Sequence, residues 1–140
     1  MAKSAATYKI TVRASTEYLS QVRDFVGEHA AAYGFNKQEV ADIRLAVDEA
    51  YTNIIKHAYQ NNTDETVDIE LGYNSEKFWV TLLDTGDTFD PLNYRKPDIC
   101  QRIKEKKRGG VGVYLIRKLM DDVEYQTEDT TNTIRMTKKK

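Results

Sequence analysis

Apolar and polar residues separate onto two sides of one stretch, Asp42–Tyr59, when it is read at the helical period of 3.6 residues. On the polar side, Glu49, Asn53 and Lys56 are spaced i, i+4 and i+7. The pattern predicts a helix that buries one face and presents a carboxylate, a carboxamide and an ammonium group in a row. The apolar stripe consists of Val40, Ile43, Val47, Ala50, Ile54 and Ala58.

The polar row of this helix has two readings. A polar helix face is most often merely solvated, and this stretch alone favours that reading. Leu45 and Ile55 interrupt the polar side, however, and a face that meets only water does not need them. They favour a second reading, in which the row forms one wall of a covered cleft.

Apolar periodicity along the rest of the chain predicts the remaining elements. Alternation predicts strands over Tyr8–Ala14, Thr66–Tyr73, Lys77–Asp84, Val123–Thr127 and Thr133–Thr137. Helical spacing predicts helices over Glu17–Gly34, from a capping box at Asn36 and Glu39 to about Tyr59, and over Val113–Asp121. This order predicts an α+β two-layer sandwich, with three helices on one face of a mixed, mostly antiparallel sheet.

Composition narrows the class of protein. The 140 residues suit a single domain over residues 1–140, and a net charge of −1 gives no overall field for nucleic acid or an anionic membrane. No apolar run is long enough to cross a bilayer, and Met1–Thr7 has no hydrophobic signal core. The lone Cys100 favours a reducing cytoplasm, and one cysteine with two scattered histidines excludes a zinc site. The closing Lys138–Lys140 run is expected to be a solvated end.

The segment Thr85–Gly109 shows no stable period. It contains Pro91 and Pro97 and ends in a charged run before the glycines. A structureless segment of this length inside a compact domain is usually a lid or a binding loop. A disordered surface insertion remains the alternative.

Two further motifs carry candidate chemistry. Gly110-x-Gly112 precedes a predicted helix, whose free amides and positive end suit a phosphate, although a glycine cluster alone is a weak signal. Asp84-x-Gly86 ends a strand, and Asp84 continues the inward parity of Phe78, Val80 and Leu82. An inward carboxylate needs a partner, and the amino group of a ligand's base would satisfy it. A purely structural turn is the alternative for Asp84.

Taken in order, these motifs resemble the three nucleotide-binding boxes of the GHKL (Bergerat-fold) ATPase and kinase superfamily. The boxes are Glu49-x-x-x-Asn53-x-x-Lys56, Asp84-x-Gly86 and Gly110-x-Gly112. With the short length, DEAYTNIIKHAY and GGVGVYLIRKLMDDVEY look most like anti-sigma factor serine/threonine kinases of bacterial partner-switching systems, the RsbW and SpoIIAB type. The likeness covers nearly the whole chain, and it implies the Bergerat fold with residues 85–109 as a nucleotide lid.

The resemblance also implies roles at the base of ATP or ADP. Asp84 would accept a hydrogen bond from the adenine amino group, with Gly86 beside the base. Thr133 matches the threonine on a late strand that helps to seat adenine in this superfamily.

At the phosphates, the resemblance implies that Asn53 holds Mg²⁺ through its side-chain oxygen, which is the kind of ligand this ion prefers. Glu49, one helical turn earlier, would take the proton from a serine or threonine hydroxyl of a protein substrate. Further contacts to the phosphates are implied for Lys56, Arg108, Gly110 and Gly112.

The implied activity is an ATP-dependent protein serine/threonine kinase that sequesters a sigma factor and phosphorylates its antagonist, an anti-anti-sigma protein. A homodimer is implied as well, with no direct contact to nucleic acid or membrane. No dimerisation hairpin with a phospho-accepting histidine precedes the boxes, so a sensor histidine kinase is not expected. Two rivals remain, a catalytically silent nucleotide-gated binding module and a simple ATP hydrolase; retention of Glu49 favours catalysis over the first.

Overall fold

Alternating apolar residues build the centre of the sheet. The computed structural model describes residues 6–59, 62, 64–86 and 108–140. In β2 (Thr66–Tyr73) and β3 (Lys77–Asp84) every second side chain is buried, at the bounds that the alternation predicts. The other strands are β1 (Ala6–Arg13), β4 (Asp122–Glu128) and β5 (Thr131–Lys139).

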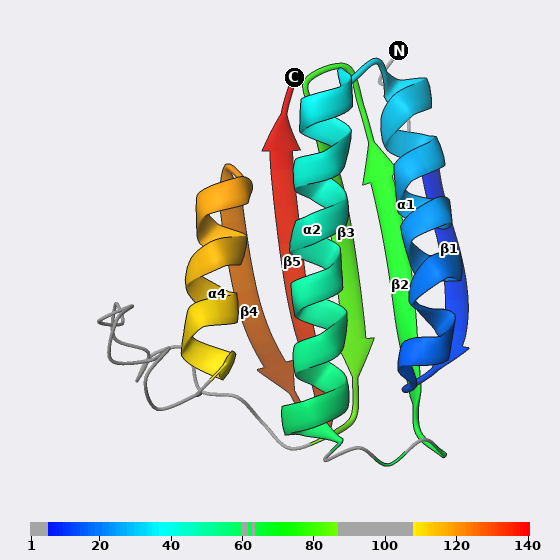
Figure 1. The fold of residues 1–140 in the computed structure, drawn as a ribbon, viewed down its shortest axis with the longest axis vertical. Helices are drawn as coiled ribbons and strands as arrows, with labels where there is room; N and C mark the ends of the chain where they lie inside the picture. Colours follow the sequence, from blue (N-terminus) through cyan, green and yellow to red (C-terminus); the bar gives the residue numbers. More distant parts are fainter. Residues whose placement is uncertain (1–5, 60–61, 63, 87–107) are drawn as a thin grey trace.

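The sheet has the order β1-β2-β3-β5-β4, and all four neighbouring pairs are antiparallel. The prediction of a mixed sheet is therefore wrong for the described residues, whereas the two-layer α+β architecture is confirmed. The reason lies in the connections. The two helices between β1 and β2 run in opposite directions, so β2 starts at the end where β1 stops (Figure 1).

Within the described ranges, three α-helices cover one face of this sheet, as predicted (Figure 1). They are α1 (Leu19–Tyr33), preceded by the 3₁₀ turn η1 (Thr16–Tyr18), then α2 (Lys37–Asn53) and α4 (Arg108–Leu119). Gly34 ends α1 in the left-handed region at φ 111°, which glycine adopts without strain. The predicted capping box of α2 is present: Glu39 N–H donates to Asn36 Oδ1 at 2.8 Å, and Asn36 N–H to Glu39 Oε1 at 3.0 Å.

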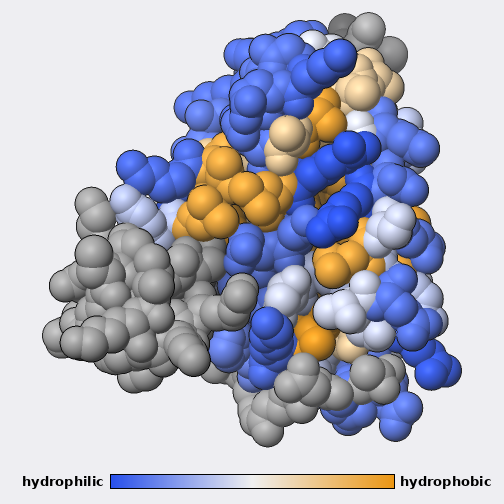
Figure 2. All heavy atoms as spheres, viewed as in Figure 1, coloured by the Kyte–Doolittle hydropathy of each residue, from blue (hydrophilic) through white to orange (hydrophobic). Residues whose placement is uncertain are grey.

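The core lies between the helices and the inward residues of the sheet. Tyr51 of α2 and Phe78 of β3 are the largest of its fully buried side chains. The outer side of the helical layer is mostly hydrophilic with apolar patches (Figure 2). Leu45 of α2 is an exposed large apolar residue. None of the helices in the described ranges is long and apolar enough to cross a membrane.

The main chain of the last three lysines is part of the fold, while Lys139 and Lys140 are exposed, as a solvated end would be. Lys138 Nζ donates to Leu119 O at 3.1 Å, and the Lys139 N–H donates to Asp121 Oδ2 at 2.6 Å. The Lys140 N–H donates to Glu76 O at 2.9 Å. β5 therefore runs through Lys139, because the residues at its C-terminal end find partners on the neighbouring elements.

Candidate functional site

Residues from the three motifs gather at one end of the molecule. The end of α2, the end of β3, the start of β5 and the start of α4 all lie at the lower end in Figure 1. Glu49 and Asn53 are one turn apart on the last two turns of α2, and both are half-buried. Their oxygen atoms therefore lie on one helix face, as the spacing predicts.

A π turn follows Asn53 at once. The segment η2 (Ile54–Ala58) closes with a hydrogen bond from the Tyr59 N–H to Ile54 O at 2.9 Å, five residues back. Because the turn is wider than an α turn, it buries both Ile54 and Ile55 in the core. Ile55 therefore does not flank a cleft, contrary to the interpretation of the sequence. Lys56 is exposed on this turn, off the α-helical row that was predicted.

The carboxylate of Asp84 points inward at the end of β3, as strand parity predicts, and the residue is only 6% exposed. Its Oδ1 accepts hydrogen bonds from the Gly86 N–H and from Asn132 Nδ2, both at 2.9 Å. Burial raises the pKa of Asp84 above its ordinary value, and these two hydrogen bonds oppose the shift. Oδ2 accepts no hydrogen bond from a described residue, so this oxygen can accept one from a ligand.

Gly86 joins this strand end to the end of η2. A Cβ atom built on Gly86 would lie 2.4 Å from Ala58 O and 2.8 Å from Tyr59 Cδ1. Only a residue without a side chain allows so close an approach. The tight contact brings the Asp84–Gly86 turn against the segment that follows Asn53.

Replacing Gly86 by alanine is expected to lower the free energy of unfolding by about 1–3 kcal/mol, the usual cost of overpacking. The obstacle is a backbone carbonyl, which cannot move aside without disturbing η2. Urea denaturation measures the change. Gly27→Ala is the matched control, because there the new methyl group meets only the end of the flexible Arg44 side chain. Equal losses in the two variants would show that the Gly86 contact is not tight.

Asn132 is the site residue that the sequence analysis missed. It pairs with Asp84 across β3 and β5, and its Nδ2 also donates to Gly86 O at 3.0 Å. Thr127 Oγ1 donates to Asn132 Oδ1 at 3.0 Å and so fixes the orientation of the amide. Only the strand register reveals this pairing, because Asn132 precedes the last strand that the alternation predicts, Thr133–Thr137.

Thr133, the predicted residue, pairs with Leu83. Paired residues on neighbouring antiparallel strands share a face, so Thr133 lies on the sheet face opposite to that of Asp84. The structure therefore brings Asn132, and not Thr133, into contact with the carboxylate.

The glycine motif lies within a helix and not before one. α4 begins at Arg108, five residues before the predicted start at Val113, so Gly110 and Gly112 belong to its first two turns. A glycine in a helix costs about 1 kcal/mol relative to alanine, which the packing of α4 on α2 can offset. The side chain of Arg108 and most of the predicted lid, residues 87–107, lie outside the described part.

The oxygen donors on α2 fit a magnesium ion. Glu49 and Asn53 offer a carboxylate and a carboxamide, and Mg²⁺ is usually bound by one or two such groups together with water and phosphate oxygens. No group of three or more histidine, cysteine or acidic residues that could cage a metal occurs among the described residues. The donor set therefore suits an ion that arrives with a phosphate ligand.

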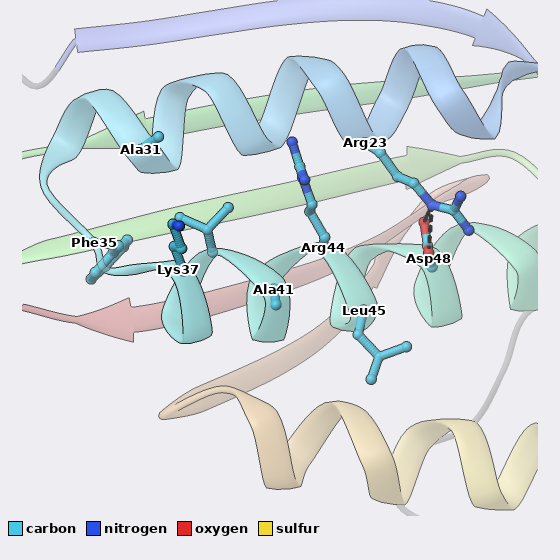
Figure 3. Close-up of a pocket in the computed structure, with 9 residues that line it drawn as sticks. Arg23, Ala31, Phe35, Lys37, Ala41, Arg44, Leu45 and Asp48 are labelled. Atoms are coloured by element: carbon cyan, nitrogen blue, oxygen red, sulfur yellow. Dashed lines mark hydrogen bonds and ion pairs between the residues drawn. The ribbon is translucent and has the colours of Figure 1, made fainter.

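A separate groove of about 470 Å³ runs along the outer side of α1 and α2 (Figure 3). Val40, Ala41 and Leu45 contribute apolar surface to it. At one end, Arg23 Nε lies 2.7 Å from Asp48 Oδ2; burial raises the pKa of Asp48, and the contact with Arg23 opposes this. In Figure 3 Leu45 points toward α4. None of the residues that line the groove belongs to the Asp84–Gly86 turn.

Comparison with known proteins yields matches over nearly the whole chain. The model of the histidine kinase-like ATPase domain matches residues 12–138. The serine-protein kinase RsbW of Bacillus subtilis (strain 168) is 31% identical over 143 residues, which cover 99% of this chain and 88% of that protein. The RsbW of Halalkalibacterium halodurans is 33% identical, with 94% of this chain and 82% of that protein covered.

Among solved structures, the RsbU and RsbW domains of Rv1364c from Mycobacterium tuberculosis superpose with a TM-score of 0.68 at 16% identity. The match covers 95% of this chain and 31% of that longer chain. At this identity the likeness shows a common fold.

Proposed function

Because this chain belongs to the histidine kinase-like ATPase domain family, and within it to the RsbW type, we propose that it is an ATP-dependent protein serine/threonine kinase. One observation carries the proposal. The carboxylate of Asp84 at a strand end has one oxygen, Oδ2, that accepts no hydrogen bond from a described residue, and it lies beside a glycine that packs on the end of η2. A carboxylate oxygen that no described donor reaches can accept a hydrogen bond from a ligand.

In this proposal the adenine base lies against the Asp84–Gly86 turn. Asp84 Oδ2 accepts a hydrogen bond from the adenine amino group, while Oδ1 stays held by Gly86 and Asn132. Asn132 takes over the role that the sequence analysis gave to Thr133, since it is the residue that contacts Asp84.

The phosphates of ATP would lie toward the start of α4. Gly110 lies in the first turn of this helix, whose free amides and positive end favour an anion, and Gly112 follows in the second turn. Lys56 and Arg108 would supply cationic side chains. Asn53, with Glu49 close by, would hold Mg²⁺, which supplies neutralisation of phosphate charge when bound. Residues 85–109 would act as the nucleotide lid of a single domain spanning residues 1–140.

Glu49 would act as the general base for the acceptor. It is half-buried and lies one turn before Asn53, so the phosphates and an incoming hydroxyl can meet beside it. Phosphoryl transfer depends mainly on positioning and charge neutralisation, so few side chains are needed for catalysis.

The proposed protein substrate is an anti-anti-sigma antagonist, and the proposed second partner is a sigma factor or another regulator that a homodimer of this chain sequesters. The first rival is a nucleotide-gated binding module that phosphorylates nothing. The second is an ATP hydrolase with water as acceptor, which would turn over ATP continuously without a protein substrate.

The test is a pull-down in which the purified chain captures proteins from an extract of its native cell, first with ADP and then with ATP and Mg²⁺. Mass spectrometry then searches the bound proteins for phosphoserine or phosphothreonine. Transfer to a small bound protein supports the kinase, whereas ATP hydrolysis without any acceptor supports the hydrolase. Nucleotide-dependent capture without phosphate transfer supports the binding module.

A further inference from the structure

We propose that the hydroxyl group of Tyr59 is a positioning group that sets the Asp84–Gly86 turn and thereby the selectivity for the nucleotide base. Tyr59 ends η2, six residues after Asn53, and is 7% exposed. Its hydroxyl donates to Thr66 O at 2.7 Å and accepts from the Thr85 N–H at 2.8 Å. One hydroxyl group therefore links the end of η2, the start of β2 and the residue between Asp84 and Gly86.

The ring and the hydroxyl of Tyr59 act on two sides of the same turn. Tyr59 Cδ1 occupies the space that a side chain on Gly86 would need, so the ring limits movement of Gly86. The Tyr59 hydroxyl accepts a hydrogen bond from the Thr85 amide, and Thr85 Oγ1 lies 3.4 Å from the same Tyr59 oxygen. Since Asp84 precedes Thr85 directly, the direction of its free Oδ2 depends on this backbone. The Asp84 carboxylate proposed to bind adenine is thus held in two ways. Asn132 contacts its side chain, and Tyr59 fixes the main chain of the next residue, Thr85.

A hydroxyl in this place is not required for packing alone. Phenylalanine would fill the same volume, yet it would leave the Thr85 N–H and Thr66 O without their partner in a part-buried setting. The expected consequence is a turn that remains folded but samples more than one backbone conformation. A misdirected acceptor loses its preference for adenine over guanine, because guanine presents a carbonyl oxygen where adenine presents an amino group.

Tyr51 offers a matched control. It is a fully buried tyrosine of α2, and its hydroxyl likewise bridges main-chain groups, donating to Arg13 O and Ser15 O and accepting from the Ser15 N–H. Its partners belong to the turn after β1 and not to the Asp84–Gly86 turn. Tyr51→Phe therefore removes the same kind of hydroxyl group and should lower the free energy of unfolding in the same way. The change lies away from the turn proposed to bind adenine.

The experiment compares Tyr59→Phe, Tyr51→Phe and the unaltered chain. Thermal melting without nucleotide shows the stability of each, and calorimetry gives Kd for ATP and for GTP at a temperature where all three are folded. Hydrogen exchange of the Thr85 amide is followed in the nucleotide-free protein. We expect comparable falls in Tm for the two variants. Only Tyr59→Phe should weaken ATP binding about tenfold and reduce the ratio of the Kd for GTP to the Kd for ATP. Only Tyr59→Phe should speed exchange at Thr85.

The inference rests on the proposed nucleotide site, and the outcomes separate the two. If the unaltered chain binds ATP and Tyr59→Phe binds ATP and GTP with the same two affinities, the positioning role is wrong while the proposed function stands. An equal loss of selectivity in Tyr51→Phe also overturns it, since a general loss of stability would then explain the effect. If the unaltered chain binds no ATP, the proposed function fails and this inference fails with it.

Discussion

Glu49→Gln is expected to bind ATP as the unaltered chain does and to transfer phosphate to its protein substrate about 10²–10⁴-fold more slowly. Glutamine has nearly the same volume and keeps a side-chain oxygen, so the half-buried end of α2 should retain its structure. It cannot accept the proton of an attacking hydroxyl group, and this step alone is lost. Calorimetry measures ATP binding, and transfer of labelled phosphate to the co-purified substrate measures the reaction.

The control for Glu49→Gln is Glu124→Gln, the same change on an exposed residue of β4. It should alter neither binding nor transfer. Unchanged transfer in Glu49→Gln would remove Glu49 from the mechanism. An equal loss of ATP binding would instead assign Glu49 to nucleotide or metal binding and leave the base unidentified.

Asp84→Asn is expected to separate stability from binding. Asparagine Oδ1 can accept the same two hydrogen bonds from Gly86 and Asn132, and the buried charge disappears. The free energy of unfolding at neutral pH should therefore change by less than about 1 kcal/mol or rise. ATP binding should weaken about 10- to 100-fold, because the new amide would turn a donor toward the adenine amino group. Calorimetry and urea denaturation on the same preparation measure both quantities.

The pH dependence of the free energy of unfolding provides a second test of the buried position of Asp84. Burial raises its pKa in the folded protein, so the folded state binds the proton more tightly than the unfolded state. The stability contributed by this proton is fully present below the ordinary value near 3.8 and is lost as the pH rises through the higher folded-state pKa. Asp84→Asn should lack this loss, so its stability relative to the unaltered chain should increase with pH across that window.

Asp122→Asn serves as the matched control for Asp84→Asn, because Asp122 is exposed on β4. It should change neither ATP binding nor the pH profile of unfolding. A variant Asp84→Asn that binds ATP normally would contradict the placement of adenine against this carboxylate.

The parts of the fold set by local pattern could be predicted from the sequence. Alternation in β2 and β3 fixes both the strand bounds and the inward direction of Asp84, since side chains in a strand change face at every residue. The capping box of α2 and the left-handed end of α1 at Gly34 depend on one or two residues with special chemistry. These features need no knowledge of tertiary contacts.

The parts that depend on distant contacts could not be predicted. Nothing in Ile54–Ala58 marks a π turn, which forms where the chain packs against Gly86, some thirty residues further along by the numbering. Whether Asn132 or Thr133 faces Asp84 is decided by the β3–β5 register, and a shift of one residue exchanges the two faces. The early start of α4 is likewise not predicted by the propensity of its glycines, which disfavour a helix.

The contacts of the last three lysines have a practical consequence for attaching the protein to a surface. The C-terminus lies at the opposite end of the sheet from the Asp84–Gly86 turn (Figure 1). A linker joined after Lys140 therefore leaves the proposed nucleotide site facing the solution. Deleting the three lysines would instead remove a contact of the fold, because Lys138 Nζ donates a hydrogen bond to Leu119 O at the end of α4. An affinity handle should thus be added beyond these residues and never put in their place.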